Sequence, residues 1–96
     1  MRIPAAVLAE IYRGRPADVE IDWLLRRVGG VMPVTRRVAR VAGTLLGREG
    51  LDSCHAVDAF VVATAVRLGG GVIATHDPTD LDRLAQAHPN VKVAAI

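Results

Sequence analysis

Hydrophobic residues recur at helical spacing through the first half of the chain and predict three amphipathic helices. We expect the first helix over residues 4–13 and the second over residues 17–28. A third follows Thr35, whose hydroxyl can cap a helix start. The breaks between these helices are glycines, which are Gly14, Gly29, Gly30, Gly47 and Gly50.

The second half of the chain contains a different kind of helix. We expect a helix over residues 55–68, which Asp52 or Ser53 can cap. From Ala56 to Val66 it is apolar on nearly every side, interrupted only by Asp58 and Thr64, which is typical of a buried helix. The remaining segments are short: strands at residues 31–34, 72–74 and 91–96, and a helix at residues 80–87. Strands separated by helices favour parallel pairing, so we expect an α/β domain that opens on a helix.

Composition narrows the class of protein. With 51% hydrophobic residues, the chain of 96 residues is not disordered, and no apolar run is long enough to cross a membrane. Its one cysteine, Cys54, can form no internal disulfide, which favours a reducing cytoplasm. The net charge of +2 comes from eleven arginines and Lys92 against ten acids, so the composition allows an anionic partner or simply a GC-rich genome.

Acidic residues at two places are candidates for chemistry. Asp58 lies on the buried helix, where a carboxylate must reach an exposed end, pair with a cation or bind a metal. Placement in the first turn of the helix would also explain it. Asp77 follows the strand at residues 72–74, where open parallel sheets bind ligands, although an Asp before a proline is also a common turn residue.

Two further acids are ambiguous by themselves. Glu10 lies at the border of the apolar stripe of the first helix, and Asp80 is more typical of a helix start than of a site. Together, Glu10, Asp58 and Asp77 indicate an oxygen-only site for a hard cation such as Mg²⁺. Cys54 and His55 are adjacent, but no second cysteine and no histidine at ligand spacing accompanies them, so a site for a soft or borderline metal is disfavoured.

The segment around Asp58 resembles the second half of a PIN domain. The residues that carry the resemblance are His55-Ala56-Val57-Asp58-Ala59-Phe60-Val61-Val62-Ala63-Thr64-Ala65, Gly71-Val72-Ile73-Ala74-Thr75-His76-Asp77 and, less specifically, Ile3-Pro4-Ala5-Ala6-Val7-Leu8-Ala9-Glu10. The most similar type is the VapC-like ribonuclease toxin of bacterial toxin–antitoxin pairs. The resemblance covers roughly the whole chain.

The resemblance implies an activity and a set of residues. The fold would be a PIN-like parallel sheet flanked by helices, and the activity a metal-dependent endoribonuclease that hydrolyses RNA phosphodiesters with a metal-activated water. Asp58 and Asp77 would hold Mg²⁺ or Mn²⁺, and Glu10 would assist. An antitoxin protein would be the partner, and a homodimer is allowed. Weaker candidates for contact with the RNA backbone are Arg36, Arg37 and Arg40.

The chain departs from the family at its start. PIN domains begin with a central strand that ends in an Asp, and no counterpart of that strand precedes Ile3. We therefore expect residues 1–96 to form one PIN-like domain without its first central strand. The alternative to a nuclease is a catalytically impaired remnant that binds an antitoxin or RNA. Candidates for an antitoxin surface are Val7, Leu8, Ile11, Trp23 and Leu24.

Overall fold

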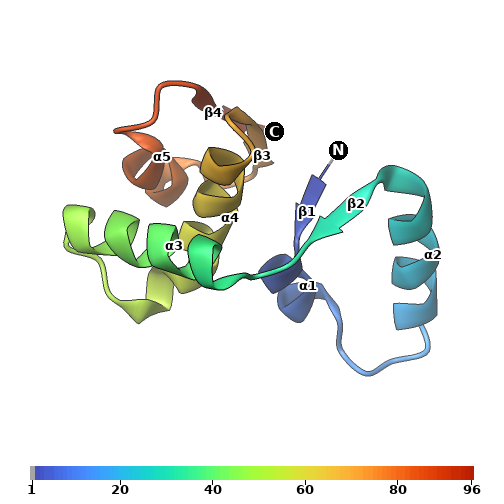
Figure 1. Ribbon diagram of the computed structural model, residues 1–96. Helices are drawn as coiled ribbons and strands as arrows, with labels where there is room; N and C mark the ends of the chain where they lie inside the picture. The colour runs from blue at the N-terminus through green and yellow to red at the C-terminus, as the bar shows by residue number, and fades with distance from the viewer. Residues whose placement is uncertain (1) are drawn as a thin grey trace. The chain divides into compact units, whose positions relative to one another are not determined.

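The computed structural model describes residues 2–96, except for the side chains of Glu10 and Val28. The chain divides into two compact units, residues 1–34 and residues 35–96. Figure 1 labels the elements of both units. The first unit contains β1 (Arg2–Pro4), α1 (Ala5–Ile11), α2 (Asp18–Val28) and β2 (Gly30–Met32).

The first unit opens on a strand, so the prediction that the chain opens on a helix is wrong. Strand β1 pairs in parallel with β2, with Arg2 opposite Gly30 and Pro4 opposite Met32. Three residues are too few to show an alternating pattern, and Pro4 also serves as the extended residue before α1. Strand β1 carries no Asp, and the absence of the family's Asp-bearing strand stays a prediction.

Helix α1 is shorter than predicted because a polar loop ends it. We expected residues 4–13, but the helix covers Ala5–Ile11 and the backbone is already extended at Tyr12. The Asp18 carboxylate accepts hydrogen bonds from the Arg13 and Gly14 N–H groups, at 3.2 and 2.7 Å. These bonds stabilise the turn that leads into α2, so the chain leaves the helix before Arg13.

The second unit contains α3 (Arg36–Glu49), the short 3₁₀ helix η1 (Ser53–His55), α4 (Ala56–Arg67), β3 (Gly71–Thr75), α5 (Thr79–Ala85) and β4 (Val91–Ala95). Thr35 caps α3 as predicted, because its hydroxyl accepts the Val38 N–H at 3.1 Å. Gly50 ends the helix in the left-handed conformation, at φ 64°. Gly47 lies inside the helix, so the prediction that it helps to close α3 is wrong.

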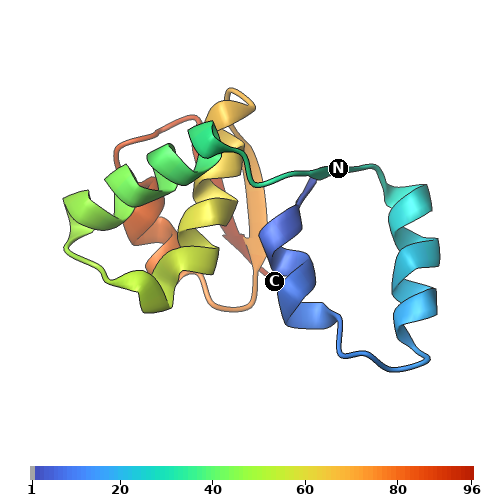
Figure 2. The same ribbon diagram turned by 60° about the horizontal axis from the view of Figure 1, so that its bottom comes forward.

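Helix α4 is the centre of the core, as its nearly continuous apolar surface predicted. It lies between α3 and the β3–β4 pair (Figure 2). Ala59, Val62 and Ala63 are fully buried, and Leu45 of α3 and Leu84 of α5 close over them. Burial of three such faces explains why α4 needs no polar stripe.

Among the described residues, each unit contains one parallel pair of strands, β1–β2 in the first unit and β3–β4 in the second. Strand β3 pairs only with β4 among the described residues, with Gly71 opposite Val91 and Thr75 opposite Ala95. The turn before β3 needs glycine: at Gly70, φ is +121° and an added Cβ would lie 2.6 Å from the Asn90 carbonyl oxygen. The predicted α/β class with parallel strands and flanking helices is confirmed.

None of the helices in the described part of the chain combines the length and hydrophobicity that a membrane span requires.

Candidate functional site

The candidate site lies where β3 ends and α4 begins. Asp58 is in the first turn of α4, and His55 is the last residue of η1, immediately before that helix. Asp80 is in the first turn of α5, just beyond β3. One ligand atom from each of these three residues lies within 4.8 Å of the other two, and we call them the His55–Asp58–Asp80 group.

His55 and Asp80 are in direct contact. The Nδ1 atom of His55 lies 3.5 Å from a carboxylate oxygen of Asp80. The two side chains are 26% and 35% exposed, so the group is open to solvent on one side but bounded by the core on the other. The rigid α4 and the packing of Leu81 in α5 set the positions of Asp58 and Asp80.

The three acids predicted from the sequence do not all gather here. Asp58 belongs to the group, whereas Asp77 is exposed and belongs to neither of the ligand groups formed by the described side chains. The loop of Asp77 is held by Thr75, whose hydroxyl accepts the Asp77 N–H at 3.1 Å. Glu10 is in α1 of the first unit, and its side chain lies outside the described residues.

The group includes two residues that the sequence pattern did not assign to the site. The pattern favours a helix start for Asp80, and it places His55 only beside Cys54. A signal existed for His55, because a spacing of three residues places it and Asp58 on one helical face. For Asp80 the signal was its place at a helix start directly after a parallel strand, where a first-turn acid faces the same edge as Asp77.

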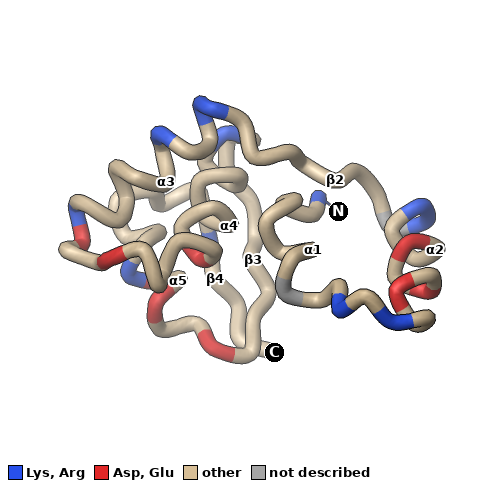
Figure 3. The backbone as a smooth tube through the Cα atoms, turned by 90° about the horizontal axis from the view of Figure 1, so that it is seen from below, with Lys and Arg blue, Asp and Glu red and all other residues tan. Residues whose placement is uncertain are grey.

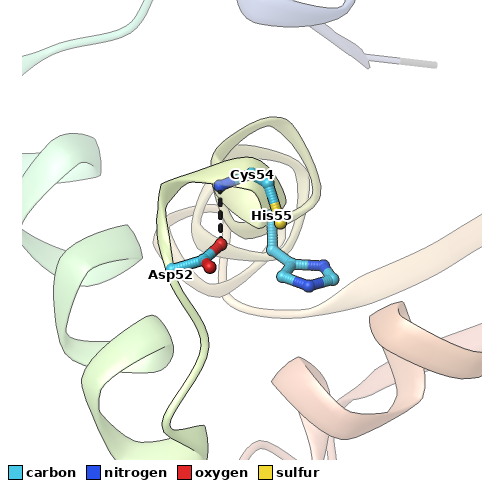
Figure 4. Close-up of side chains that lie close together, drawn as sticks. All are labelled: Asp52, Cys54 and His55. Carbon is cyan, nitrogen blue, oxygen red and sulfur yellow. Dashed lines mark hydrogen bonds between the residues drawn. The ribbon is translucent and has the colours of Figure 1, made fainter.

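A second set of ligand atoms lies beside the first. Asp52, Cys54 and His55 also lie within 4.8 Å of one another (Figure 4). The Asp52 carboxylate accepts the Cys54 N–H at 2.9 Å and so caps η1. Hydrogen bonding to Cys54 lowers the pKa of Asp52, and the bond to Asp52 raises the pKa of the Cys54 thiol. The raised pKa disfavours the thiolate, which is the form of cysteine that acts as a nucleophile or metal ligand.

The arginines suggested for RNA contact are also together. Arg36, Arg37 and Arg40 are exposed on the first turns of α3 and line an open pocket of about 380 Å³. Arginine offers paired donors that match phosphate oxygens, so the pocket has the chemistry of an anion site.

The fold and the group together define an α/β protein with carboxylates gathered past the end of a parallel strand. The PIN domain family matches residues 1–87, a range that includes the His55–Asp58–Asp80 group and Asp77. The chain therefore belongs to the PIN domain family. No curated protein and no solved structure matches the chain significantly. Membership indicates nuclease activity in general, a divalent cation as cofactor and RNA as a class of ligand.

Proposed function

We propose that this chain is a metal-dependent endoribonuclease of the VapC-like type, the toxin of a type II toxin–antitoxin pair. The observation that supports this most is the His55–Asp58–Asp80 group, which brings two carboxylates and an imidazole within 4.8 Å in a chain of the PIN family. In this proposal both compact units are parts of one PIN domain over residues 1–96, and a cognate antitoxin protein is the partner.

The donor set fits a divalent cation. Carboxylate oxygens are the ligands that Mg²⁺ and Mn²⁺ prefer, and an imidazole suits Mn²⁺ better than Mg²⁺. The partial exposure of His55 and Asp80 leaves room for the waters and phosphate oxygens that complete such a site. When bound, the cation would supply positive charge against the phosphodiester.

The protein side chains would contribute by holding the cation ligands in fixed positions. Asp58 is fixed by the most buried helix, and His55 orients Asp80 through their 3.5 Å contact. Helix α5 is in turn tied to the end of α3, because the Arg83 guanidinium donates to the Glu49 carbonyl at 3.2 Å. Asp77 and Glu10 remain in the proposal with the roles that the resemblance implies. Asp77, in the loop before α5, would help to hold the cation, and Glu10 would assist by binding the metal or by orienting the attacking water.

Binding of Mn²⁺ tests the site directly. Asp58→Asn and Asp80→Asn should each weaken Mn²⁺ binding at least about tenfold, since each removes a charged ligand. Asp82→Asn is the matched control, because Asp82 is an exposed acid on the same helix as Asp80 and belongs to neither ligand group. Isothermal titration measures all four proteins. Equal affinities would remove the group from the proposal.

Cleavage of single-stranded RNA tests the activity. The protein with Mn²⁺ or Mg²⁺ should cleave RNA in an EDTA-sensitive way, and Asp58→Asn and Asp77→Asn should abolish the cleavage, whereas Asp82→Asn should not. If Asp77→Asn cleaves normally while Asp80→Asn does not, the further acid of the site is Asp80 and the assignment of Asp77 is wrong.

An exposed apolar face on α2 favours a second candidate function, a PIN remnant that binds an antitoxin or RNA without cleaving it. Val19, Trp23 and Leu24 are 70%, 50% and 51% exposed, which is costly unless a partner covers them. Metal binding without any cleavage, together with retained binding of RNA, would support this module over the enzyme.

A further inference from the structure

The first turns of α3 concentrate positive charge in one place. The guanidinium groups of Arg36, Arg37 and Arg40 line a pocket of about 380 Å³, which we call the arginine pocket. Arg40 lies four residues after Arg36 and three residues after Arg37, so its side chain is a neighbour of both on the surface of the helix. Figure 3 shows these positions in blue along the start of α3.

No described side chain neutralises the arginine pocket. Among the described residues, the three guanidinium groups form neither an ion pair nor a hydrogen bond. Other arginines of the chain are engaged: Arg83 donates to the Glu49 carbonyl, and Arg27 lies 4.1 Å from the centre of the Trp23 ring. The arginine pocket is therefore a cluster of cations without internal partners in the described part of the chain.

The helix itself adds to this charge. The pocket lies at the N-terminal end of α3, where the helix dipole is positive and acidic side chains are favourable, yet the first turn contains no acid. The Thr35 hydroxyl accepts the Val38 N–H, and the N–H groups of the first turn of a helix have no partner within the helix. Three cations at this end oppose the dipole, and a bound anion would relieve that repulsion.

The arginine pocket and the His55–Asp58–Asp80 group lie at opposite ends of α3. The bond from Arg83 to the Glu49 carbonyl joins α5 to the C-terminal end of α3, and Asp80 precedes Arg83 by less than one helical turn. Helix α3 has 14 residues and is therefore about 20 Å long. The two sites are separated by roughly that length, which corresponds to about six stacked nucleotides of a single strand.

We propose that Arg36, Arg37 and Arg40 bind phosphates of the RNA backbone at a point several nucleotides away from the bond that is cleaved. Guanidinium groups match phosphate oxygens with paired hydrogen bonds, and three of them can hold successive phosphates. The identity of the ligand as RNA rests on the nuclease function proposed above. The pocket sets affinity and the minimal length of the substrate, and it takes no part in the chemistry.

Binding of uncleaved RNA tests this proposal apart from cleavage. All proteins carry Asp58→Asn and are measured with EDTA by fluorescence anisotropy on a labelled twelve-nucleotide strand, a length of about twice the estimated span. Loss of three phosphate contacts in the triple variant R36Q/R37Q/R40Q should weaken binding at least about tenfold at low salt. It should also reduce the slope of log affinity against log salt by about two.

A matched control separates a site from bulk charge. The variant R15Q/R26Q/R48Q loses the same charge from three exposed arginines outside the pocket, and it should bind within about twofold of the parent. Equal losses in the two triple variants would overturn the proposal. Circular dichroism checks folding, and if the pocket variant is unfolded, single Arg→Gln changes are measured, each expected to lower the salt slope by about 0.7.

Competition with other anions shows whether the arginine pocket binds an RNA strand or a different anionic ligand. Inorganic phosphate and a mononucleotide should compete only weakly, and a four-nucleotide strand should bind much less tightly than the twelve-nucleotide one. If phosphate or the mononucleotide competes as well as the long strand, the pocket is a small-anion site and not an RNA subsite. Preferential binding of an acidic peptide would likewise overturn it. If the unsubstituted protein binds RNA through the arginine pocket but does not cleave it, the proposed nuclease function is wrong and the RNA-binding site stands.

Discussion

The two compact units are built from the same kinds of element but differ in what those elements bury. Each contains helices and one parallel strand pair. Every described residue that is buried belongs to residues 35–96, whereas in residues 1–34 Val19, Trp23 and Leu24 are at least half exposed. Apolar periodicity therefore predicts a helix, but the width of the helix's apolar surface predicts whether a core forms around it.

A pair of leucine substitutions should show this difference in burial most strongly. Leu45 is 2% exposed, so Leu45→Ala should lower the free energy of unfolding by about 2–5 kcal/mol. Leu24→Ala, on the half-exposed face of α2, should cost less than about 1 kcal/mol. Urea unfolding followed by circular dichroism measures both. A cost for Leu24→Ala as large as that for Leu45→Ala would mean that α2 is packed in solution.

Amide hydrogen exchange should separate the two units without any substitution. The N–H groups of α4, the helix with the most buried residues, should open only with global unfolding, whereas those of α1 and α2 should exchange at least about tenfold faster. Mass spectrometry of peptides from the two units gives the rates. Uniform protection across residues 2–96 would contradict the difference in burial between the units.

The sequence predicted the elements better than their pairing. Helix α4 was expected over residues 55–68 and covers Ala56–Arg67. The prediction is close because a long segment that is apolar on nearly every side is typical of a buried helix. Strand β2 ends at Met32, since Pro33 has no N–H to donate. Strand β1 was not predicted, because three residues are too few to show an alternating pattern. The strand is defined by its pairing with β2, which the local sequence does not reveal.

The candidate site was predictable in the same partial way. Asp58 could be recognised from the sequence alone, because it is an acidic residue within an otherwise apolar helical segment and a buried carboxylate requires a partner. His55 and Asp80 come from two different elements, and their 3.5 Å contact depends on how α5 packs against α4. Such convergence is a tertiary property, so no local spacing connects positions 55 and 80.

A smaller effect is expected where the second unit begins. Thr35→Ala removes the hydroxyl that accepts the Val38 N–H and should lower the free energy of unfolding by about 1 kcal/mol. Thr35→Ser keeps an acceptor at the same place and should restore most of that loss. Urea midpoints of the three proteins measure the cost. A full loss in the serine variant would indicate that the methyl group of Thr35, and not its hydrogen bond, stabilises α3.

The smallest effect concerns the polar contacts that hold the first unit in place of a core. The Tyr12 hydroxyl donates a hydrogen bond to the Asp22 carboxylate, and this bond, together with the negative charges of Asp22 and Asp18, raises the pKa of Tyr12. The contact therefore contributes fully below pH about 10 and is lost as the pH rises through the raised pKa.

The chain has a single tyrosine, so its phenolate absorbance reports this pKa without overlap from another residue. Asp22→Asn removes the acceptor charge and should shift the titration of Tyr12 back toward its ordinary value. Glu20→Gln is the matched control, because Glu20 is an exposed acid of the same helix that does not act on Tyr12. If the parent and Asp22→Asn titrate together, the hydrogen bond is absent in solution, and the first unit lacks even this polar contact between the end of α1 and α2.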